Sequence, residues 1–429
     1  MDVLEIFKFK DQGEEMFVGG SVTNEWIVEC LEKNDHKFTQ YREDDKILRI
    51  DAYDISDGKG FLSKVYKVSI HLDNHKKDPY IIIVKIPGEE SIRESFDKQK
   101  INIQKTDDKT LSHITRFHNV ECTFYIYIAP LIRGLKYPKC YGAQAYEIGK
   151  KDGAVIMQYL GSNSKTIPFY VGLNVSQTVS VLEEVYKLHK YSLINPNDQW
   201  KGRFEPPYQQ KTFKKIEGYI KNTWGKTKKY MSSEMIKEIE DDVLILMDNY
   251  AVIASEAYDE IEPCDNNQGV LTHGDMWINN FMFKTDINGN CTNELRAIID
   301  WQTVHEGSIG LDIARVLIVS APPDVRRELE KNYLPDHYKR LTSTLRREKK
   351  PFKISYDGFM YNYKICMVEQ SLMLIMMIGF ALQEFNIPEK EDYVWDARKF
   401  NIGARIYFAL FDSIKICQEL KPEWLKKIN

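Results

Sequence analysis

The sequence predicts an α+β protein in which a small antiparallel sheet comes first and a larger, mainly helical part follows. Two observations lead to this class. Alternating or short apolar runs dominate the first 160 residues, and apolar residues at helical spacing dominate the rest. A chain of 429 residues is long enough for two lobes with a core each. We therefore expect one domain over residues 1–160 and a second over residues 161–429.

The predicted sheet begins with two strands that should pair. Residues 66–72 alternate between apolar and polar side chains, which is typical of a half-buried strand. Residues 80–86 are almost continuously apolar, which is typical of a strand buried on both faces, and Pro87 and Gly88 end this run. The polar turn between the two runs favours an antiparallel pair.

Helical periodicity takes over in the second part. Val179, Leu182 and Tyr186 share one helical face, and Ser176 is a candidate N-cap for that helix. Other helices are expected over residues 111–128, 241–253 and 363–382, and a second strand pair over residues 139–145 and 154–160. Residues 200–235 are polar, and their pattern predicts no element.

Composition excludes several classes of protein. With 59 basic and 63 acidic residues the net charge is −4, which argues against a nucleic-acid partner. Seven scattered cysteines without Cys-x-x-Cys spacing predict neither a zinc site nor a disulfide framework, and they fit the reducing cytoplasm. The charged N-terminal residues do not resemble a signal peptide. The longest apolar stretch, residues 372–382, is too short for a membrane span and is expected to be a buried helix.

Lys85 and Glu121 are predicted to form a buried ion pair. Lys85 ends a run of β-branched residues in a strand expected to be central, where an ammonium group is costly without a partner. Glu121 shares a helical face with Phe117 and Phe124 and needs a partner for the same reason. Each residue also has a plainer interpretation: a strand-end lysine that reaches water, and a glutamate at the rim of the core. Each residue would supply the partner that the other needs, and the ion pair would orient Lys85 towards nucleotide phosphates.

A glycine-containing segment lies just before the first strand of the predicted pair. Gly58 and Gly60 would let the backbone approach a phosphate closely, and Ser63 would add a hydroxyl or an amide. Two glycines near a strand are also typical of a plain turn. No helix is expected directly after them, so their spacing does not indicate a dinucleotide-binding Rossmann motif.

The strongest candidate site is the short loop that carries His273, Asp275 and Asn280 between two apolar flanks. Asp275 is suited to accept a hydrogen bond from an attacking hydroxyl, and Asn280 to bind Mg²⁺ through its side-chain oxygen. His273 is expected to pack beneath the loop and to hydrogen-bond its backbone. A His/Asp pair also suggests a hydrolase, but the sequence has no Gly-x-Ser-x-Gly motif to supply a serine nucleophile.

Two further aspartates follow this loop. Asp300 ends the apolar run of residues 295–299 and is a candidate second Mg²⁺ ligand; the alternative is a turn or cap aspartate. Asp312 lies among apolar residues, so we expect it to be buried and to accept hydrogen bonds from the backbone of the candidate loop. An N-cap role for Asp312 is the alternative, and the two are compatible.

At these residues the chain resembles the aminoglycoside phosphotransferase and choline kinase group of small-molecule kinases, and within it the ecdysteroid-kinase-like, or CHK-kinase-like, family. The shared motifs are Val84-Lys85, Phe117-x-x-x-Glu121-x-x-Phe124-Tyr125, His273-Gly-Asp275-x-x-x-x-Asn280, Ile299-Asp300-Trp301 and Gly310-x-Asp312-Ile-Ala. In order and spacing the resemblance spans roughly residues 50–320. The resemblance implies a protein-kinase-like fold of two lobes, which binds ATP between them and transfers its γ-phosphoryl group to a hydroxyl of a small molecule.

The resemblance also implies a role for each matching residue. Lys85 would contact the α- and β-phosphates of ATP, and Glu121 would hold it. Asp275 would be the catalytic base, with Asn280 and Asp300 as ligands of Mg²⁺. The hinge, whose backbone would hydrogen-bond the adenine, would consist of Met157, Gln158, Tyr159 and Leu160. Choline kinases usually have other residues around the catalytic aspartate, so choline is not the favoured acceptor.

We therefore expect an ATP- and Mg²⁺-dependent kinase for a small hydroxylated molecule, such as a steroid, another lipid-like alcohol or a glycosylated xenobiotic. A pseudokinase that binds a ligand without turnover is the alternative from another class, and the intact set of motif residues weighs against it. Protein-kinase activity is a third alternative, but no Ala-Pro-Glu motif follows Asp300 at the spacing of an activation loop. The sequence determines neither the acceptor nor the oligomeric state.

Overall fold

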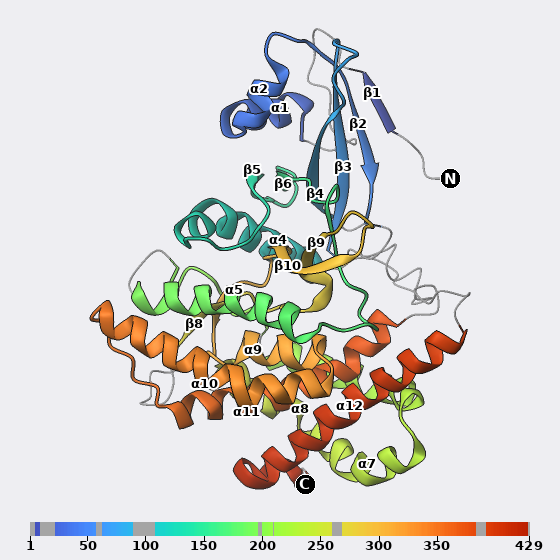
Figure 1. The fold of residues 1–429 in the computed structure, drawn as a ribbon, viewed down its shortest axis with the longest axis vertical. Helices are drawn as coiled ribbons and strands as arrows, with labels where there is room; N and C mark the ends of the chain where they lie inside the picture. Colours follow the sequence, from blue (N-terminus) through green and yellow to red (C-terminus); the bar gives the residue numbers. More distant parts are fainter. Residues whose placement is uncertain are drawn as a thin grey trace. The chain divides into compact units, whose positions relative to one another are not determined.

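The computed structural model describes residues 5–8, 22–56, 62–88, 108–195, 200–208, 210–259, 268–382 and 392–427. The chain forms two compact units (Figure 1). The first comprises Met1–Leu131 and Tyr137–Ser162, and the second comprises Ile132–Lys136 and Asn163–Asn429. One unit is built on an antiparallel sheet and the other mainly on helices, so the predicted α+β class is confirmed. The assignment of nucleotide binding to residues 1–160 and of catalysis to residues 161–429 stays a prediction.

A six-stranded antiparallel sheet forms the first unit. Its strands are β1 (Glu5–Lys8), β2 (Ile47–Asp54), β3 (Ser63–Leu72), β4 (Tyr80–Pro87), β5 (Cys140–Gln144) and β6 (Ala154–Gln158). They lie in the order β1-β2-β3-β4-β6-β5, so both predicted strand pairs are present. β4 is a central strand, in which Lys85 lies opposite Val65 of β3 and Val155 of β6. This position explains the apolar run of β4, because a strand between two neighbours exposes little of either face.

Helices flank this sheet. They are α1 (Asn24–Asn34), α2 (His36–Arg42) and α4 (Asp108–Thr123), and α4 continues as the π-helical turn η2 (Phe124–Ile128) and the short turn η3 (Ala129–Leu131). Ile27 and Leu31 of α1 are fully buried in one core with Val68 and Ile82 of the sheet. The predicted helix over residues 111–128 is therefore confirmed in extent, with its last turn π-helical instead of α-helical.

The second unit is mainly helical. Its long helices are α5 (Val175–Ile194), α6 (Gln210–Thr227), α7 (Ser233–Asp248), α8 (Tyr250–Asp259), α10 (Pro323–Arg347), α11 (Tyr356–Ala381) and α12 (Asp392–Leu420), with short turns η4 (Lys228–Tyr230) and η8 (Pro422–Leu425). α11 is surrounded by α6, α8, α12 and the short helix α9 (Leu311–Arg315). Leu372, Leu374 and Ile375 are fully buried there, which confirms the predicted buried helix. Within the described residues no helix has the length and apolarity of a membrane span.

Three helix predictions need correction. The N-cap of α5 is Asn174 instead of Ser176: Asn174 and Gln177 form a reciprocal capping box, with hydrogen bonds of 2.9 and 3.1 Å. The helix predicted over residues 241–253 is two helices, α7 and α8, because Asn249 interrupts it and donates its side-chain amide to the carbonyls of Trp424 and Lys426. The polar segment without a predicted element contains α6, whose apolar side faces α8 and α11.

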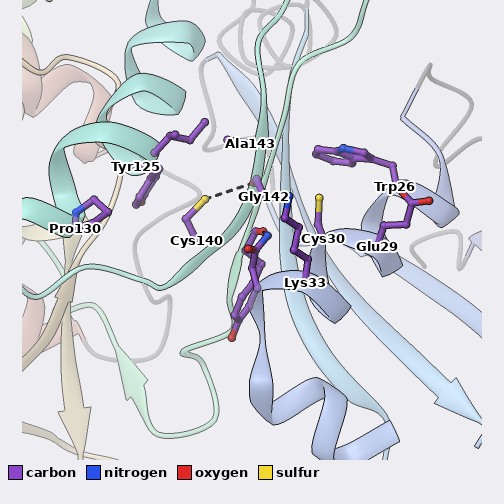
Figure 2. Close-up of a pocket in the computed structure, with 12 residues that line it drawn as sticks. Trp26, Glu29, Cys30, Lys33, Tyr125, Pro130, Cys140, Gly142 and Ala143 are labelled. Carbon is purple, nitrogen blue, oxygen red and sulfur yellow. Dashed lines mark hydrogen bonds between the residues drawn. The ribbon is translucent and has the colours of Figure 1, made fainter. Parts of the chain in front are cut away.

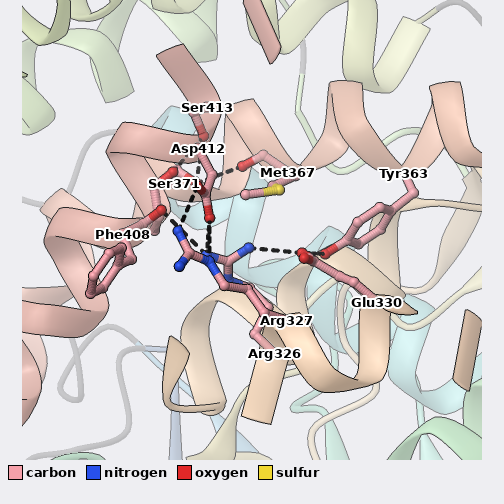
Figure 3. Close-up of polar contacts among 10 residues, drawn as sticks. Arg326, Arg327, Glu330, Tyr363, Met367, Ser371, Phe408, Asp412 and Ser413 are labelled. Atoms are coloured by element: carbon pink, nitrogen blue, oxygen red, sulfur yellow. Dashed lines mark hydrogen bonds and ion pairs between the residues drawn. The ribbon is translucent and has the colours of Figure 1, made fainter. Parts of the chain in front are cut away.

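A network of charges joins α10, α11 and α12 (Figure 3). Arg326, which is almost fully buried in α10, donates to Glu330 at 2.8 Å and to Asp412 of α12 at 2.5 Å. Arg327 binds the other oxygen of Asp412 at 2.8 Å. Tyr363 of α11 donates to Glu330 at 2.6 Å. Through these contacts α10 is joined to α12 by Arg326 and Arg327 and to α11 by Glu330.

Short strands and turns carry the predicted catalytic loop. They are β7 (Ser164–Lys165), β8 (Val270–Thr272), η5 (Ile278–Asn280), β9 (Phe281–Thr285), β10 (Cys291–Ile298), β11 (His305–Gly307) and η6 (Val316–Ser320). β8 pairs with β11, and β9 lies between β10 and β7. The loop therefore begins at the end of one small sheet and runs into the central strand of another, which fixes its backbone at both ends.

Candidate active site

Lys85 and Glu121 form the predicted ion pair in the first unit. The Lys85 ammonium lies 2.7 Å from a carboxylate oxygen of Glu121, and the exposed fractions of the two side chains are 11% and 1%. Lys85 comes from the central strand β4 and Glu121 from the last turns of α4. A second contact from α4 fixes the helix to the sheet edge, since His118 hydrogen-bonds the Gln144 carbonyl at 2.9 Å. The lysine is thus held by a helix that is itself anchored.

The structure describes only part of the predicted phosphate-binding segment, and one backbone donor of the predicted hinge is already used. Gly58 and Gly60 lie outside the described residues, and Ser63 is a buried residue at the start of β3. The backbone N–H of Gln158 already donates to the carbonyl of Lys139 at 2.8 Å. Gln158 therefore cannot give that donor to an adenine, and any such contact falls to the residues around it.

A cavity of about 520 Å³ in the first unit is lined by other residues (Figure 2). Trp26 and Cys30 of α1, Tyr125 of η2 and Cys140 of β5 are among its walls. The Cys140 thiol donates a hydrogen bond to the Gly142 carbonyl, and both residues line the cavity. None of the residues predicted for phosphoryl transfer lines this cavity.

Gly274 gives the predicted catalytic loop its shape. Its φ of +80° lies in the left-handed region that favours glycine, and a Cβ at this position would lie 2.6 Å from the Thr303 carbonyl oxygen. The Thr303 hydroxyl donates to the carbonyl of His273 at 2.8 Å, which holds the strand end on the other side. The chain turns sharply at Gly274 and directs Asp275 away from β8.

His273 supports the loop, as the sequence predicts. Its Nδ1 accepts a hydrogen bond of 3.1 Å from the backbone N–H of Asp275, and its Nε2 lies 3.1 Å from the Ile299 carbonyl oxygen. This requires the tautomer in which Nε2 carries the proton. The ring is fully buried against Trp301, with ring centroids 4.5 Å apart. Both nitrogens are engaged by backbone groups, so the imidazole is a scaffold and has no nitrogen left to act as a base.

Asp312 anchors the same loop from α9. Its Oδ2 accepts from the His273 N–H at 2.7 Å and its Oδ1 from the Gly274 N–H at 3.0 Å. The predicted contact with the loop backbone is therefore confirmed, whereas the N-cap of α9 is Gly310. Burial raises the pKa of the Asp312 carboxyl, against the opposing effects of His273, the two N–H donors and Arg315.

Both carboxylate oxygens of Asp275 are oriented by side chains. The Asn280 amide donates to the Asp275 carbonyl at 2.9 Å and to Oδ2 at 3.2 Å. The guanidinium of Arg315 pairs with Oδ1. Asp275 keeps 23% of its side chain exposed, whereas Arg315 keeps 7%. The aspartate is thus a fixed carboxylate with one side open to a ligand.

Asn280 and Asp300 come together through the β9–β10 hairpin. Phe281 lies opposite Ile298, and the Ile299 N–H donates to the Asn280 carbonyl at 3.0 Å, so Asp300 follows directly beyond that pair. Asp300 has a φ of +67°, which turns it out of the strand direction. Because the Asn280 amide nitrogen is used by Asp275, its Oδ1 is the atom that can face a cation.

These two oxygen donors fit Mg²⁺ that arrives with a nucleotide. Magnesium in such sites takes one or two carboxylate or amide oxygens and completes its octahedron with phosphates and water. Among the described residues no cluster of three or more His, Cys, Asp or Glu side chains could hold a metal ion alone.

A family model described as "Uncharacterized oxidoreductase dhs-27" matches residues 48–401. The chain belongs to this family. A Caenorhabditis elegans protein with the same name is 27% identical over 377 residues, which are 84% of this chain and 42% of that protein. The chain thus spans less than half the length of this relative. The description of this family does not specify ecdysteroid kinases, so that part of the resemblance stays a proposal.

Solved structures with a similar chain path include phosphotransferases. Choline kinase from Cryptosporidium parvum Iowa II is 14% identical, with 94% of this chain and 97% of that chain covered and a TM-score of 0.42. Macrolide 2'-phosphotransferase from Brachybacterium faecium is 11% identical, with 86% and 96% covered and a TM-score of 0.36. At such low identities and TM-scores, these similarities assign no activity to the chain.

Sequence reasoning missed Arg315. It lies 40 positions after Asp275, in an apolar segment, and no motif drew attention to it. One signal was present: Arg315 follows Asp312 by three residues, which places both on the same face of a helix. Because Asp312 was expected to contact the candidate loop, a charged residue on the same helical face was a candidate for contacting that loop too.

Proposed function

We propose that this protein is an ATP- and Mg²⁺-dependent kinase that transfers the γ-phosphoryl group to a hydroxyl of a small molecule. The observation that carries the proposal is the loop in which the Asn280 amide orients Asp275, while the Asn280 backbone carbonyl pairs with the N–H of Ile299, the residue before Asp300. A fixed carboxylate next to two oxygen ligands is what in-line phosphoryl transfer requires, because this reaction depends on positioning and charge neutralisation more than on base strength.

Each site residue has a role in this proposal. Asp275 accepts the hydrogen bond of the acceptor hydroxyl and takes its proton as the new P–O bond forms, while the bond from the γ-phosphorus to the β,γ-bridging oxygen breaks and ADP leaves with that oxygen. Asn280 and Asp300 would hold Mg²⁺, which would supply positive charge to neutralise the phosphates. Lys85, kept in place by Glu121, binds the α- and β-phosphates. Support for the last role is the buried 2.7 Å ion pair, which presents a single ordered ammonium from a central strand.

The finer assignments are part of the same proposal. Adenine would bind at the hinge of Met157, Tyr159 and Leu160, without the N–H of Gln158. An ecdysteroid-like or other steroid alcohol is the first acceptor to test, on the resemblance of the motifs. A reducing compartment such as the cytoplasm fits the free thiols, which include the buried Cys366 and Cys417.

The family description names an oxidoreductase, and the described residues argue against that activity for this stretch of chain. A nicotinamide-binding Rossmann unit is built on a parallel sheet with crossover helices. Every pairing between the strands described here is antiparallel. The name belongs to a relative of which this chain spans 42%, so a dehydrogenase in the remainder of that relative is compatible with a kinase here.

An untargeted metabolite screen tests the proposal. The wild-type chain is incubated with Mg-ATP and pooled small alcohols, and products are sought by mass spectrometry as a gain of one phosphate. Asp275→Asn is the matched control, since it keeps the size of the side chain and removes the carboxylate. Mg-ATP binding without any phosphorylated product would favour the pseudokinase. Stabilisation by NADH but not by ATP would favour the oxidoreductase.

A further inference from the structure

Arg315 contacts Asp275 from a helix that also holds the loop backbone. Its Nη2 donates to Oδ1 of Asp275, and Asp312, one turn earlier in α9, accepts the N–H groups of His273 and Gly274. α9 therefore fixes the loop at two places, once at the backbone and once at the side chain of the proposed base.

The guanidinium is itself held on its other side. Arg315 Nη1 donates to Oε1 of Gln370 at 2.9 Å, and Gln370 Nε2 donates to Oε2 of Glu369 at 2.6 Å. The Tyr250 hydroxyl donates to Oε1 of Glu369 at 2.8 Å. Glu369 and Gln370 are fully buried, and Tyr250 is almost so. A chain of hydrogen bonds thus runs from α8 through α11 to α9 and ends at Asp275.

Arg315 is the direct ionic partner of Asp275 and at the same time the donor to the side-chain oxygen of Gln370. A planar guanidinium can bind a carboxylate and an amide oxygen at once in a fixed geometry, which a lysine ammonium cannot reproduce. The position of the guanidinium therefore defines where Oδ1 of Asp275 lies.

We propose that Arg315 is a positioning residue for Asp275 and that Gln370 and Glu369 hold Arg315 in the orientation this requires. With Oδ1 bound to Arg315, Oδ2 is the oxygen that meets the acceptor hydroxyl, since its contact with Asn280 is the longer one at 3.2 Å. The contact of Oδ2 with an acceptor hydroxyl rests on the proposed kinase function. The positioning of the loop by Arg315 is independent of that function and is tested separately.

Hydrogen exchange tests the positioning without any turnover. In Arg315→Ala, the backbone amides of residues 273–280 should exchange at least tenfold faster than in the wild type, because the loop loses its side-chain anchor. Millimolar guanidinium ion, far below denaturing concentrations, should restore part of the protection. Arg340→Ala is the matched control: that arginine pairs with Glu183 on α5 and should leave the loop unchanged. Unchanged exchange of the loop in Arg315→Ala would overturn the inference.

Kinetics test the link to catalysis. Turnover in Arg315→Ala should fall on the order of 100-fold with the KM for ATP nearly unchanged, since a small displacement of a catalytic group acts on kcat. Guanidinium ion should restore part of the turnover in Arg315→Ala and none in Asp275→Asn. A merely structural arginine would lower the apparent kcat only in proportion to the folded fraction, with KM unchanged and no rescue by guanidinium ion, and that result would contradict the inference.

A second variant covers the case in which Arg315→Ala does not fold. Gln370→Leu keeps the guanidinium and removes the oxygen that holds it, so it should loosen the same loop to a smaller degree. A Gln370→Leu protein with wild-type exchange and wild-type kcat would overturn the role of the supporting chain. A wild-type protein that phosphorylates nothing would refute the proposed function, and the exchange experiment would still decide on Arg315.

Discussion

The ammonium of Lys85 and the carboxylate of Glu121 lie 2.7 Å apart in the first unit, and both side chains are almost fully buried. Lys85→Met should remove ATP binding and should also lower the free energy of unfolding by about 3–5 kcal/mol, because it leaves the Glu121 carboxylate buried without this cation. The double variant Lys85→Met with Glu121→Leu should regain most of that stability and no ATP binding. Chemical denaturation and ATP titration measure the two effects. A double variant as unstable as Lys85→Met would show that the pair is not the cause.

Gly274 and Gly289 form a matched pair for testing the loop. Both have a φ near +80°, at +80° and +77°, but a Cβ would meet the Thr303 carbonyl at Gly274 and nothing within 4 Å at Gly289. Gly289→Ala should cost about 1–2 kcal/mol from backbone strain and leave activity intact. Gly274→Ala should cost more and should abolish turnover, because the loop must shift away from Thr303. Equal effects of the two substitutions on turnover would contradict this account of the loop.

Asp300 should govern the metal dependence. Asp300→Ala should abolish turnover and weaken the effect of Mg²⁺ on ATP affinity, because the amide oxygen of Asn280 alone is a weak ligand for a divalent cation. Asp286→Ala, in the turn of the same hairpin, removes a carboxylate that accepts the N–H groups of Asn288 and Asn290. It should lower stability and leave the Mg²⁺ dependence unchanged. ATP titrations with and without Mg²⁺ distinguish the two, and full activity of Asp300→Ala would exclude the metal role.

Buried histidines should make the fold sensitive to acid. Burial lowers the pKa of His118 to about 4 and that of His337 to about 3, from an ordinary value of 6.5. A histidine with a lowered pKa binds a proton less readily in the folded state than in the unfolded state. Its contribution to the free energy of unfolding is therefore complete above pH 6.5 and is lost as the pH falls towards the folded-state pKa. Each of the two should cost about 2 kcal/mol by about pH 5. Unfolding followed from neutral to acidic pH measures the slope. His118→Gln should reduce it, and substitution of the exposed His75 should not.

The network around Asp412 should be a main support of the helical unit. Asp412→Ala leaves Arg326 buried in α10 without this carboxylate, which should cost about 3–5 kcal/mol. Asp396→Ala removes an exposed i,i+3 partner of Lys399 and should cost less than about 0.5 kcal/mol. Thermal unfolding of the two variants checks the difference. A loss of similar size in both would mean that burial does not set the strength of these pairs.

Much of the fold and of the candidate site was predictable because its signals are local. Alternation identified β3 and the buried run identified β4, since period and apolarity are properties of neighbouring residues. The pairing of Lys85 with Glu121 could be predicted because each is a charged residue in an otherwise apolar strand or helical face and so needs a partner. The roles of His273 and Asp312 as supports of the loop also followed, since buried polar groups must find hydrogen-bond partners.

Helix boundaries were less predictable, for a physical reason. Asn174 caps α5 in place of Ser176, two positions away, and both residue types are good caps, so propensity does not choose between them. Asn249 ends α7 because its side chain meets carbonyls near the C-terminus of the chain, more than 170 positions further on. Such a contact leaves no trace in the local pattern.

The sequence by itself determined the α+β class, the central strand with its lysine, and the short loop in which Asp275 and Asn280 lie five residues apart. Only the tertiary structure decided that Arg315 faces Asp275 and that Gln370 and Glu369 stand behind it. Periodicity tells which side of a helix is buried, but it does not tell which helix lies opposite. Contacts between α9, α11 and the loop depend on how separate elements pack, and packing is a property of the folded chain.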